Sequence, residues 1–328
     1  MRFVLIGPGA VGGVVGGRMA EHGHDVVLVA RGAHRDAIAA RGLTVEWPEG
    51  SVTLPIPVVG SPADLSFGLD DVVIVAVKSQ DTAGVVESLA AVAPSSTPIV
   101  CLQNGVANEV AFLRRFSSVH GVTVMAPTWH LEPGVVRAYT HDAAAILDIG
   151  RWPSGADDVT EAVAAAFRSS GFESIARADI RRWKYAKLLL NLGNPVDALC
   201  ERDGADFDRL ARLARVEGEA VLDAAGIEYV SAAEDRERRG DILRIIPIND
   251  EARPGASTWQ SLARGLPVEV DHLNGEIVLL GRLHGVPTAV NELLQEETHR
   301  AVARRTPPGS IPPGELLARL PALGHGSA

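Results

Sequence analysis

The sequence predicts an α/β domain with a doubly wound, mostly parallel sheet, followed by an all-helical domain. A glycine-rich turn stands between an apolar strand and a helix near the start of the chain. Apolar strands then alternate with helical segments up to about residue 178, which is typical of a doubly wound sheet. Beyond Ile180 the apolar residues recur with helical spacing, and strand patterns are nearly absent.

The first half alternates strands and helices in the order that a parallel sheet requires. Residues 2–6 form a short apolar strand, a helix follows to about His22, and residues 25–30 form a second strand. A signal peptide is the competing interpretation, but six glycines between Gly7 and Gly17 would interrupt its apolar region. Further strands are expected at 52–59, 71–77, 98–102, 122–126, 135–139 and 144–149, and helices at 82–93 and 157–169.

The second half is expected to consist of helices alone. They are predicted at 181–193, 207–225, 231–244, 258–264, 268–284 and 289–304. A Rossmann domain is therefore expected over residues 1–178 and a helical domain over residues 179–305. Residues 306–328 carry five prolines and are expected to form a loose tail.

Length and composition agree with two folded domains. The chain has 328 residues, and a domain has roughly 150. The 31 basic and 41 acidic residues give a net charge of −10, which makes the chain a poor candidate for binding nucleic acid. No apolar run approaches the ~18 residues of a membrane helix, and two cysteines are too few for a disulfide framework. We therefore expect a cytoplasmic protein that binds neither nucleic acid nor a membrane.

The turn after the first strand has the spacing of a dinucleotide-binding site. Gly7, Gly9 and Gly12 form Gly-x-Gly-x-x-Gly between a strand and a helix, the context that makes this motif specific. The first glycine permits the tight turn, the second lets the backbone approach a pyrophosphate, and the third allows close packing. Ala10 and Val11 open the helix, whose unpaired N–H groups favour phosphate. The alternative is a glycine-rich turn without a ligand.

The end of the second strand favours NADPH over NADH. A carboxylate at this position would bind the ribose hydroxyl of NAD, but Arg31 stands there and Asp36 lies too far along the chain. His34 and Arg35 follow closely, and cations here suit the 2′-phosphate of NADP. The alternative is a solvated arginine at a strand end.

Two polar residues follow buried strands at their carboxyl ends. Lys78 comes directly after Val77, and Asn104 follows the strand at 98–102 within Gln103-Asn104-Gly105. Open α/β sheets bind ligands at this edge. Both residues are therefore candidate site residues, although either position also suits the cap of a following helix.

The second domain carries a polar stripe among leucines. Lys187, Asn191 and Asn194 are spaced i, i+4, i+7, which places all three on one face of a regular helix. Buried polar groups need partners, so the stripe is expected to line a cavity where Lys187 acts as general acid. Only three of the 31 basic residues are lysines, Lys78, Lys184 and Lys187. Lys184 is expected on a neighbouring, solvated face.

Two further residues are candidates on weaker grounds. Ser257 begins a polar segment, and Glu269 lies in the first turn of a predicted helix, where it accepts substrate hydrogen bonds or interacts with the helix dipole. The histidines His22 and His24 have no accompanying ligand set, so no metal is expected.

Together these segments resemble the ketopantoate reductase family over about residues 1–304. The resemblance implies a Rossmann domain, a helical domain akin to that of 6-phosphogluconate dehydrogenase, and an active site in the cleft between them. It also implies NADPH-dependent reduction of a 2-oxo acid, 2-dehydropantoate to pantoate, within pantothenate biosynthesis. The segments that carry it are Gly7–Gly12, Val77-Lys78, Gln103–Gly105, Lys187–Pro195 and Val268–Gly275. Apart from the resemblance, the acidic helical domain could present a dimer face, so a homodimer is one alternative for the oligomeric state.

The resemblance also assigns roles to individual residues. The positions that hold NADPH in the family are matched by Gly7, Gly9, Gly12 and Arg31. Lys78 and Asn104 match positions on the cofactor and substrate sides of the family's active-site cleft. Lys187 matches the proton donor. Asn191, Asn194, Ser257 and Glu269 match substrate-binding positions, and Glu269 is counted with Lys187 as catalytic.

Three departures from the family pattern lie on the substrate side. Asn194 follows Lys187 by seven positions instead of eight, which turns it by ~100° on a regular helix unless Gly193 and Pro195 distort it. Trp259 replaces a smaller residue, and Pro254 stands where the family has an asparagine. The alternatives are therefore an NADPH-dependent reductase of another ketone or 2-oxo acid, and a non-catalytic NADP-binding regulatory protein.

Overall fold

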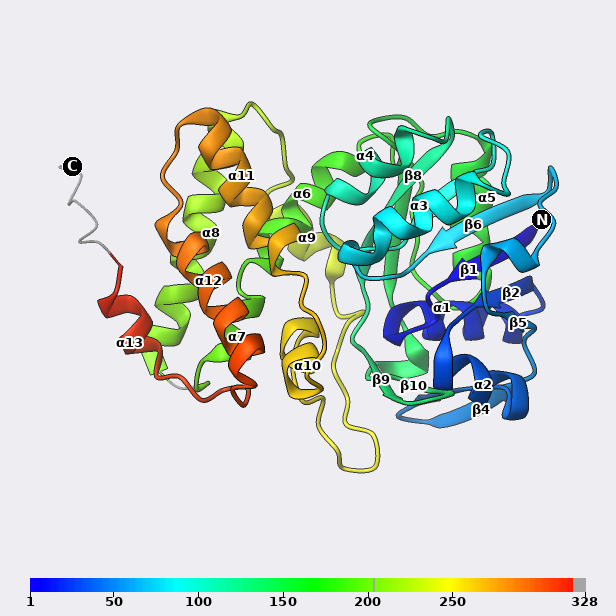
Figure 1. Ribbon diagram of the computed structural model, residues 1–328, viewed down its shortest axis with the longest axis horizontal. Coiled ribbons are helices and arrows are strands. Elements are labelled where there is room, and N and C mark those ends of the chain that lie inside the picture. The colour runs from blue at the N-terminus through cyan, green and yellow to red at the C-terminus, as the bar shows by residue number, and fades with distance from the viewer. Residues whose placement is uncertain (203, 321–328) are drawn as a thin grey trace. The chain divides into compact units, whose positions relative to one another are not determined.

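A computed structural model describes residues 1–202 and 204–320 and divides the chain into two compact units. Unit 1 contains residues 1–184 and 229–253, and unit 2 contains the remaining described residues. This division differs from the single boundary expected at residue 178, because the segment 229–253 returns to unit 1. The elements of each unit are shown in Figure 1.

A seven-stranded sheet forms the centre of unit 1. Its strands are β1 (Arg2–Ile6), β2 (Asp25–Val29), β5 (Val58–Val59), β6 (Asp71–Val75), β7 (Ile99–Cys101), β8 (Val119–Met125) and β11 (Ile146–Arg151). Their order is β11-β8-β7-β6-β1-β2-β5. All neighbours run parallel except β11 and β8. The predicted doubly wound, mostly parallel sheet is thus confirmed.

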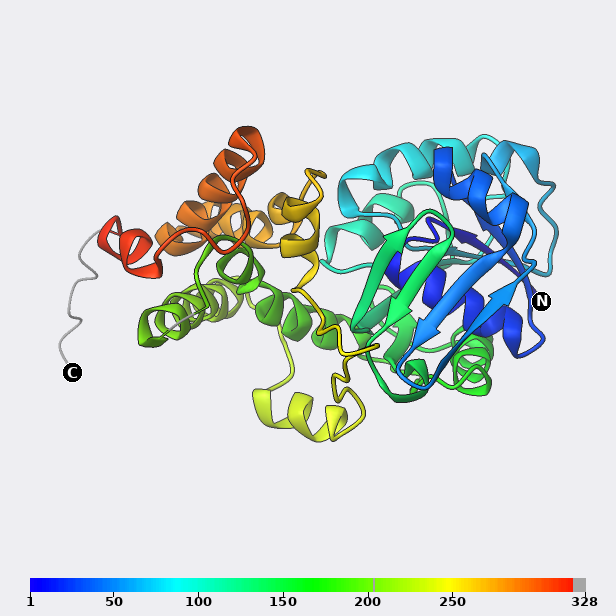
Figure 2. The ribbon, with the colours of Figure 1, turned by 90° about the horizontal axis from the view of Figure 1, so that it is seen from below.

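Helices cover both faces of this sheet. They are α1 (Ala10–Glu21), α2 (Gly32–Arg41), α3 (Thr82–Ala90), α4 (Ala107–Leu113) and α5 (Asp158–Ser169). Helices α1 and α5 pack against each other, as do α3 and α4, and Figure 2 shows α3 and α5 on opposite sides of the sheet. The central strands are therefore continuous runs of buried aliphatic residues.

A second sheet of four strands covers the outer side of α1. It contains β3 (Leu43–Trp47), β4 (Gly50–Leu54), β9 (Thr128–Glu132) and β10 (Val135–Ala138) in the order β4-β3-β10-β9. The sequence predicted no second sheet. The strand expected at 52–59 is divided between the sheets, because Pro55 and Pro57 interrupt it: β4 belongs to the second sheet and β5 to the main one.

Glycines let α1 pack closely between the two sheets. A Cβ on Gly12 would lie 2.5 Å from the carbonyl oxygen of Gly7 and 2.8 Å from the Cβ of Ala76. A Cβ on Gly17 would lie 2.4 Å from Val45 in the second sheet. Each glycine lowers the stability of a helix by about 1 kcal/mol relative to alanine. At Gly12 and Gly17 this loss is accepted because only glycine lets the helix backbone come so close to the sheets.

Unit 2 is built from helices among its described residues. None of its helices, nor any other described helix, is long and apolar enough to cross a membrane.

Helix α6 begins in unit 1 and continues into unit 2. The helices are α6 (Ile180–Asn191), α7 (Asn194–Leu199), α8 (Gly204–Ala224), α10 (Ser257–Ala263), α11 (Asn274–His284), α12 (Ala289–Arg304) and α13 (Pro313–Ala318), with the short η4 (Val270–His272) before α11.

The segment 229–253 is fixed to unit 1 by a buried carboxylate. Asp148, which is 1% exposed, accepts hydrogen bonds at 2.7 and 2.9 Å from Arg238 in α9 (Ala232–Arg239) and at 2.7 Å from Arg177. The backbone of Ile246 also donates to Tyr139 at 2.9 Å. The helix predicted at 231–244 ends at Arg239. Asp148, the partner of Arg238, is too distant in sequence for local spacing to indicate it.

The expectation of a loose tail is wrong for residues 306–320. Leu316 in α13 is 1% exposed, and Arg319 forms a 2.6 Å ion pair with Glu297 of α12. Ile311 exchanges backbone hydrogen bonds with residues 199 and 201. The segment 306–320 therefore packs against the other helices of unit 2. Residues 321–328 of the predicted tail lie outside the described part of the chain.

We expect Leu316→Ala to lower the free energy of unfolding by about 2–4 kcal/mol, because it removes a fully buried leucine from the α13 contact. Urea denaturation measures the effect. The matched control is Leu283→Ala, since Leu283 is 68% exposed and its truncation should cost less than about 0.5 kcal/mol. Equal effects of the two variants would show that α13 does not pack as described.

Candidate active site

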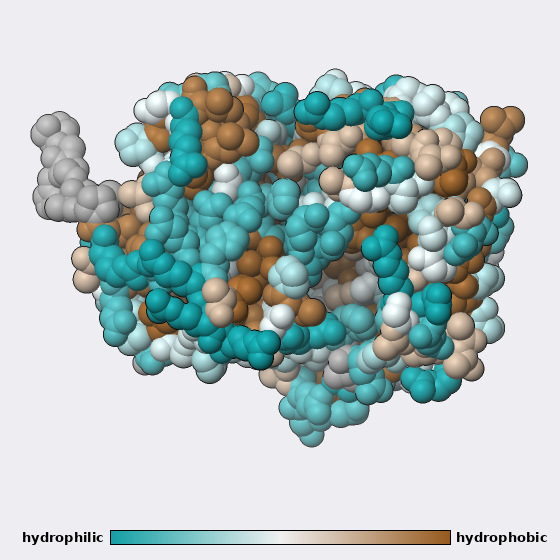
Figure 3. Space-filling view, viewed as in Figure 1, coloured by the Kyte–Doolittle hydropathy of each residue, from teal (hydrophilic) through white to brown (hydrophobic). Residues whose placement is uncertain are grey.

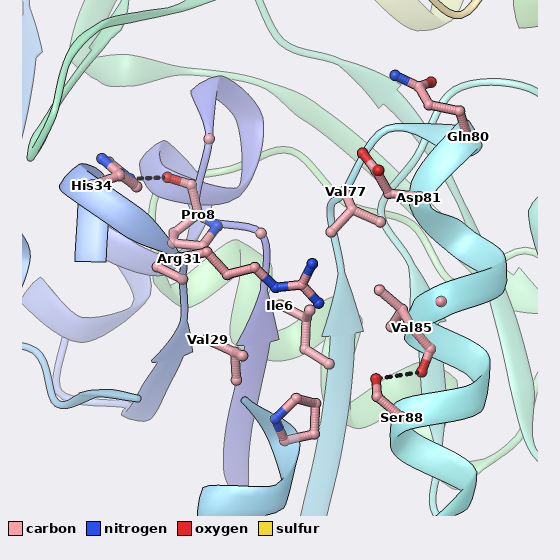
Figure 4. A pocket seen from close by; sticks show the side chains of 15 residues that line it. Ile6, Pro8, Val29, Arg31, His34, Val77, Gln80, Asp81, Val85 and Ser88 are labelled. Carbon is pink, nitrogen blue, oxygen red and sulfur yellow. Dashed lines mark hydrogen bonds between the residues drawn. The ribbon is translucent and has the colours of Figure 1, made fainter. Parts of the chain in front are cut away.

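Unit 1 contains a cavity of about 410 Å³ at the carboxyl ends of β1 and β2. The glycine-rich turn forms one wall, the start of α2 contributes Arg31, and the first turns of α3 form the opposite wall (Figure 4). This is the edge at which open α/β sheets bind ligands. The side chains that Figure 4 labels include Pro8, Arg31, His34, Val77 and Asp81.

The glycine-rich turn suits a dinucleotide. Gly7 adopts a φ of +85°, and its N–H donates to the carbonyl of Val29 at 3.0 Å, which fixes the turn at the sheet edge. A Cβ on Gly9 would meet no protein atom within 4 Å. Protein packing therefore does not require glycine there, whereas close approach of a pyrophosphate would. Helix α1 starts at Ala10 without a side-chain cap, so its first N–H groups face the same region.

Arg31, which follows the second strand, lines the cavity. It is exposed and precedes α2. Arg35 instead forms a 2.6 Å ion pair with its neighbour Asp36. His34 lines the cavity but bonds to the backbone of Pro8 and Gly134. With Arg35 held by Asp36 and His34 by Pro8 and Gly134, Arg31 stays the predicted contact for the 2′-phosphate.

The structure brings Lys78 and Asn104 to neighbouring strand ends. They follow β6 and β7, which pair in parallel. Gln103 Nε2 donates to the carbonyl of Val77 at 2.8 Å and so ties the two ends together. Asn108 Nδ2 donates to the carbonyl of Asn104 at 2.9 Å. A buried hydrogen-bond network therefore holds the backbone that carries both candidate residues.

Lys184 and Glu109 extend this network with a buried ion pair. Their side chains are 2% and 0% exposed, and Lys184 Nζ also donates to the carbonyl of Gln103 at 2.9 Å. Burial raises the pKa of the Glu109 carboxyl, and the Lys184 ammonium opposes that shift. The prediction that Lys184 is solvated is wrong. Local spacing could not indicate its burial, since its partner Glu109 lies in α4, far away in the sequence.

In unit 2, Lys187 and Asn191 share α6, but Asn194 does not. Helix α6 ends at Asn191, and Asn194 begins α7 after Gly193. The prediction of a single helical stripe is therefore wrong for Asn194, because the helix is interrupted beside Gly193 and Pro195, the alternative to a regular helix. Asn274, which is fully buried, donates to the carbonyl of Leu192 at 3.0 Å and holds this break. Asn191 is 5% exposed, and Lys187 is half-buried.

The remaining candidates lie around these helices. Ser257 begins α10, which packs against α7. The backbone N–H of Ala256 donates to Asp197 of α7 at 2.9 Å. Glu269 precedes η4 and is half-buried. The helix expected at 268–284 is thus interrupted, and Glu269 does not lie in the first turn of α11.

The candidates therefore fall into two groups, each held within one unit. Among the described residues, no group of His, Cys, Asp and Glu is placed to hold a metal ion. The sequence analysis did not predict the parts that Glu109 and Asn108 play in the buried network. The rarity of lysine was the one available signal, because it singled out Lys184, the partner of Glu109. Unit 1 carries Gly7, Gly9, Ala10, Val11, Gly12, Arg31, Lys78 and Asn104; unit 2 carries Lys187, Asn191, Asn194, Ser257 and Glu269.

Comparison with known proteins identifies the family. The family model of ketopantoate reductase PanE/ApbA matches residues 3–154, and the model of its C-terminal domain matches residues 179–301. The 2-dehydropantoate 2-reductases of Archaeoglobus fulgidus and Pyrococcus horikoshii are 31% and 30% identical to this chain. These alignments cover 89% and 90% of this chain and 95% of each relative. The chain belongs to the ketopantoate reductase family. The resemblance predicted from the sequence is thereby confirmed.

Solved structures share the fold. A PanE/ApbA family ketopantoate reductase from Ralstonia eutropha JMP134 is 28% identical, with a TM-score of 0.78, over 93% of this chain and 99% of that one. D-mandelate dehydrogenase with NADH and anilino(oxo)acetate has a TM-score of 0.80 over 93% of this chain and 99% of that one. It is only 19% identical, so that likeness shows the fold alone. The predicted fold class of an α/β domain followed by a helical domain is confirmed.

We expect Lys184→Met to lower the free energy of unfolding by about 3–5 kcal/mol, because it leaves the Glu109 carboxylate buried without its cation. The double variant Lys184→Met/Glu109→Gln should recover much of this loss. Urea denaturation measures both variants.

The control for this experiment is an exposed ion pair in the same protein. Arg282 and Glu292 are 70% and 40% exposed and lie 3.2 Å apart, so Arg282→Met should cost at most about 1 kcal/mol. A Lys184→Met effect no larger than that of the control would contradict the buried pair.

Proposed function

We propose that this protein reduces 2-dehydropantoate to pantoate with NADPH. Its membership of the ketopantoate reductase family over both matched regions is the observation that carries the proposal. The cavity of unit 1 supports it, because the glycine-rich turn and Arg31 line one space. The named relatives supply the choice of 2-oxo acid.

The residues of unit 1 suit NADPH. Gly7, Gly9 and Gly12 would admit the pyrophosphate, and the N–H groups of Ala10 and Val11 would bind it. Arg31 would hold the 2′-phosphate, since a guanidinium matches a phosphate in charge and geometry. Lys78 and Asn104 would lie toward the nicotinamide. When bound, NADPH supplies the hydride for the reaction.

The residues of unit 2 would bind the substrate and protonate it. A new C–H bond forms at the keto carbon as the carbonyl π bond breaks, and the oxygen then needs a proton. Lys187 would donate that proton from its ammonium group, as a general acid. Glu269 would accept a hydrogen bond from a substrate hydroxyl. The substrate's remaining polar groups would bind Asn191, Asn194 and Ser257.

A second candidate is the reduction of a different 2-oxo acid or ketone. Trp259 carries this alternative, because its ring packs on Gly255 so tightly that a Cβ on Gly255 would lie 2.5 Å from Trp259 Cγ. The large side chain is thus fixed beside Ser257 in the chain. A non-catalytic NADP-binding protein is the third candidate, and the presence of Lys187 and Glu269 speaks against it.

The direct test mixes the protein with NADPH and 2-dehydropantoate and follows NADPH absorbance, with NADH as the control cofactor. Consumption of NADPH would support the proposed reaction. Binding of NADPH without consumption would reject 2-dehydropantoate and direct the search to bulkier or more apolar ketones. Consumption with NADH alone would reject the role of Arg31.

Two broader expectations stay predictions. A homodimer is supported by the exposed side chains of Leu279 and Leu283, which are 51% and 68% exposed on α11. Figure 3 shows apolar side chains gathered over the carboxyl-terminal end of that helix. A ketopantoate reductase from Staphylococcus aureus is described as dimeric. The cytoplasmic location likewise stays a prediction.

We expect Lys187→Met to reduce kcat by at least about 100-fold, because general acid catalysis contributes 10²–10⁴-fold. NADPH binding, measured by fluorescence titration, should remain unchanged. Arg181→Met is the control, since it removes an exposed basic residue from the same helix. If Lys187→Met retains turnover, Lys187 is not the proton donor.

We expect Arg31→Gln to weaken NADPH binding by about 10–100-fold, because a hydrogen bond to a charged group contributes roughly 1.5–3 kcal/mol. NADH binding should be unaffected. Arg35→Gln is the matched control, because Arg35 pairs with Asp36. Fluorescence titration with both cofactors measures the change, and equal losses for NADPH and NADH would contradict the assignment of the 2′-phosphate to Arg31.

A further inference from the structure

His34 connects three separate segments of unit 1 at the edge of the cavity. It lies in the first turn of α2 and is half-buried. One ring nitrogen, Nε2, is 2.7 Å from the carbonyl oxygen of Pro8 in the glycine-rich turn. The other, Nδ1, is 2.9 Å from the backbone nitrogen of Gly134, which lies between β9 and β10. Figure 4 shows the bond from His34 to Pro8 beside Arg31.

The chemistry of the two partners determines the protonation of the ring. A backbone N–H can only donate, so Nδ1 must accept from Gly134. A carbonyl oxygen can only accept, so Nε2 must carry a proton and donate it to Pro8. Both bonds exist together only in the neutral imidazole with its proton on Nε2. In an imidazolium, Nδ1 would also carry a hydrogen, which would point at the N–H hydrogen of Gly134 and remove this bond.

His34 is therefore unsuited to act as a cation for phosphate, and its contact with Pro8 indicates another role. Pro8 stands between Gly7 and Gly9, whose backbones rotate more freely than those of other residues. A rotated Pro8–Gly9 peptide would turn the Pro8 carbonyl oxygen into the cavity. An oxygen with partial negative charge would repel the phosphate oxygens of a dinucleotide there.

We propose that His34 is a positioning residue for NADPH, which holds the Pro8 carbonyl away from the pyrophosphate by a hydrogen bond from Nε2. The bond from Gly134 to Nδ1 fixes the tautomer and anchors the ring to the hairpin of the second sheet. The ring of His130 on β9 supports it, with centroids 4.4 Å apart. This inference rests on the proposed function only in taking NADPH as the ligand.

Two substitutions separate the bonds that His34 makes. The side-chain amide nitrogen of His34→Gln stands near the position of Nε2 and can donate to Pro8. The amide oxygen of His34→Asn stands near the position of Nδ1 and can accept from Gly134. His34→Ala loses both bonds. Each variant is compared with the unaltered protein by NADPH titration, steady-state kinetics and thermal unfolding.

We expect His34→Ala to raise the Kd of NADPH about tenfold, the loss typical of one hydrogen bond. At saturating NADPH, kcat should stay within about twofold, because a positioning role ends once the cofactor is bound. His34→Gln should return the Kd to within about threefold of the unaltered protein. His34→Asn should bind NADPH as weakly as His34→Ala while recovering most of the lost melting temperature.

Several results would overturn the proposal. Equal Kd values for His34→Gln and His34→Asn would show that the Pro8 bond has no special effect on binding. A lower melting temperature in His34→Ala with an unchanged Kd would reduce His34 to a structural role. If the unaltered protein binds NADPH without reducing 2-dehydropantoate, only the proposed reaction fails. If it does not bind NADPH at all, both proposals fail.

Discussion

The close packing of α1 between two sheets is the constraint on which unit 1 depends. Gly12 brings the helix against the Gly7 carbonyl and Ala76, which directly follows β6, and Gly17 brings it against Val45 in the second sheet. Any larger side chain would push the helix away from one sheet or the other. Because the helix cannot move, its amino terminus stays at the carboxyl end of β1. The cavity and the second sheet thus owe their positions to opposite faces of the same helix.

Buried polar contacts determine where the distant parts of the chain attach. Asp148 accepts from Arg177 and Arg238 and so holds the segment 229–253 on unit 1. Glu109 does the same for the amino-terminal half of α6 through Lys184. In unit 2, Asn274 holds the break between α6 and α7. Each contact satisfies a group that would be costly if buried alone, so each fixes one arrangement of the backbone.

The sequence predicts those features that depend on neighbours along the chain. The strand, turn and helix around Gly7–Gly12 are fully local, and their order along the chain was therefore predictable. The position of Arg31 at a strand end is local as well. Features set by distant partners were missed: Lys184 with Glu109, Arg238 with Asp148, and Leu316 against unit 2. The expected stripe failed at Asn194 because a helix break depends on what receives the freed carbonyls, here Asn274.

The scarcity of lysine acquires a physical meaning at Lys184. Of the 31 basic residues only three are lysines, so arginine serves wherever a solvated cation suffices. At Lys184 the ammonium lies between the Glu109 carboxylate and the Gln103 carbonyl, and its Cδ would be 3.0 Å from a Cβ on Gly121. A planar guanidinium is larger and needs more acceptors than these two. The choice of lysine at position 184 therefore reflects the small size of this buried site.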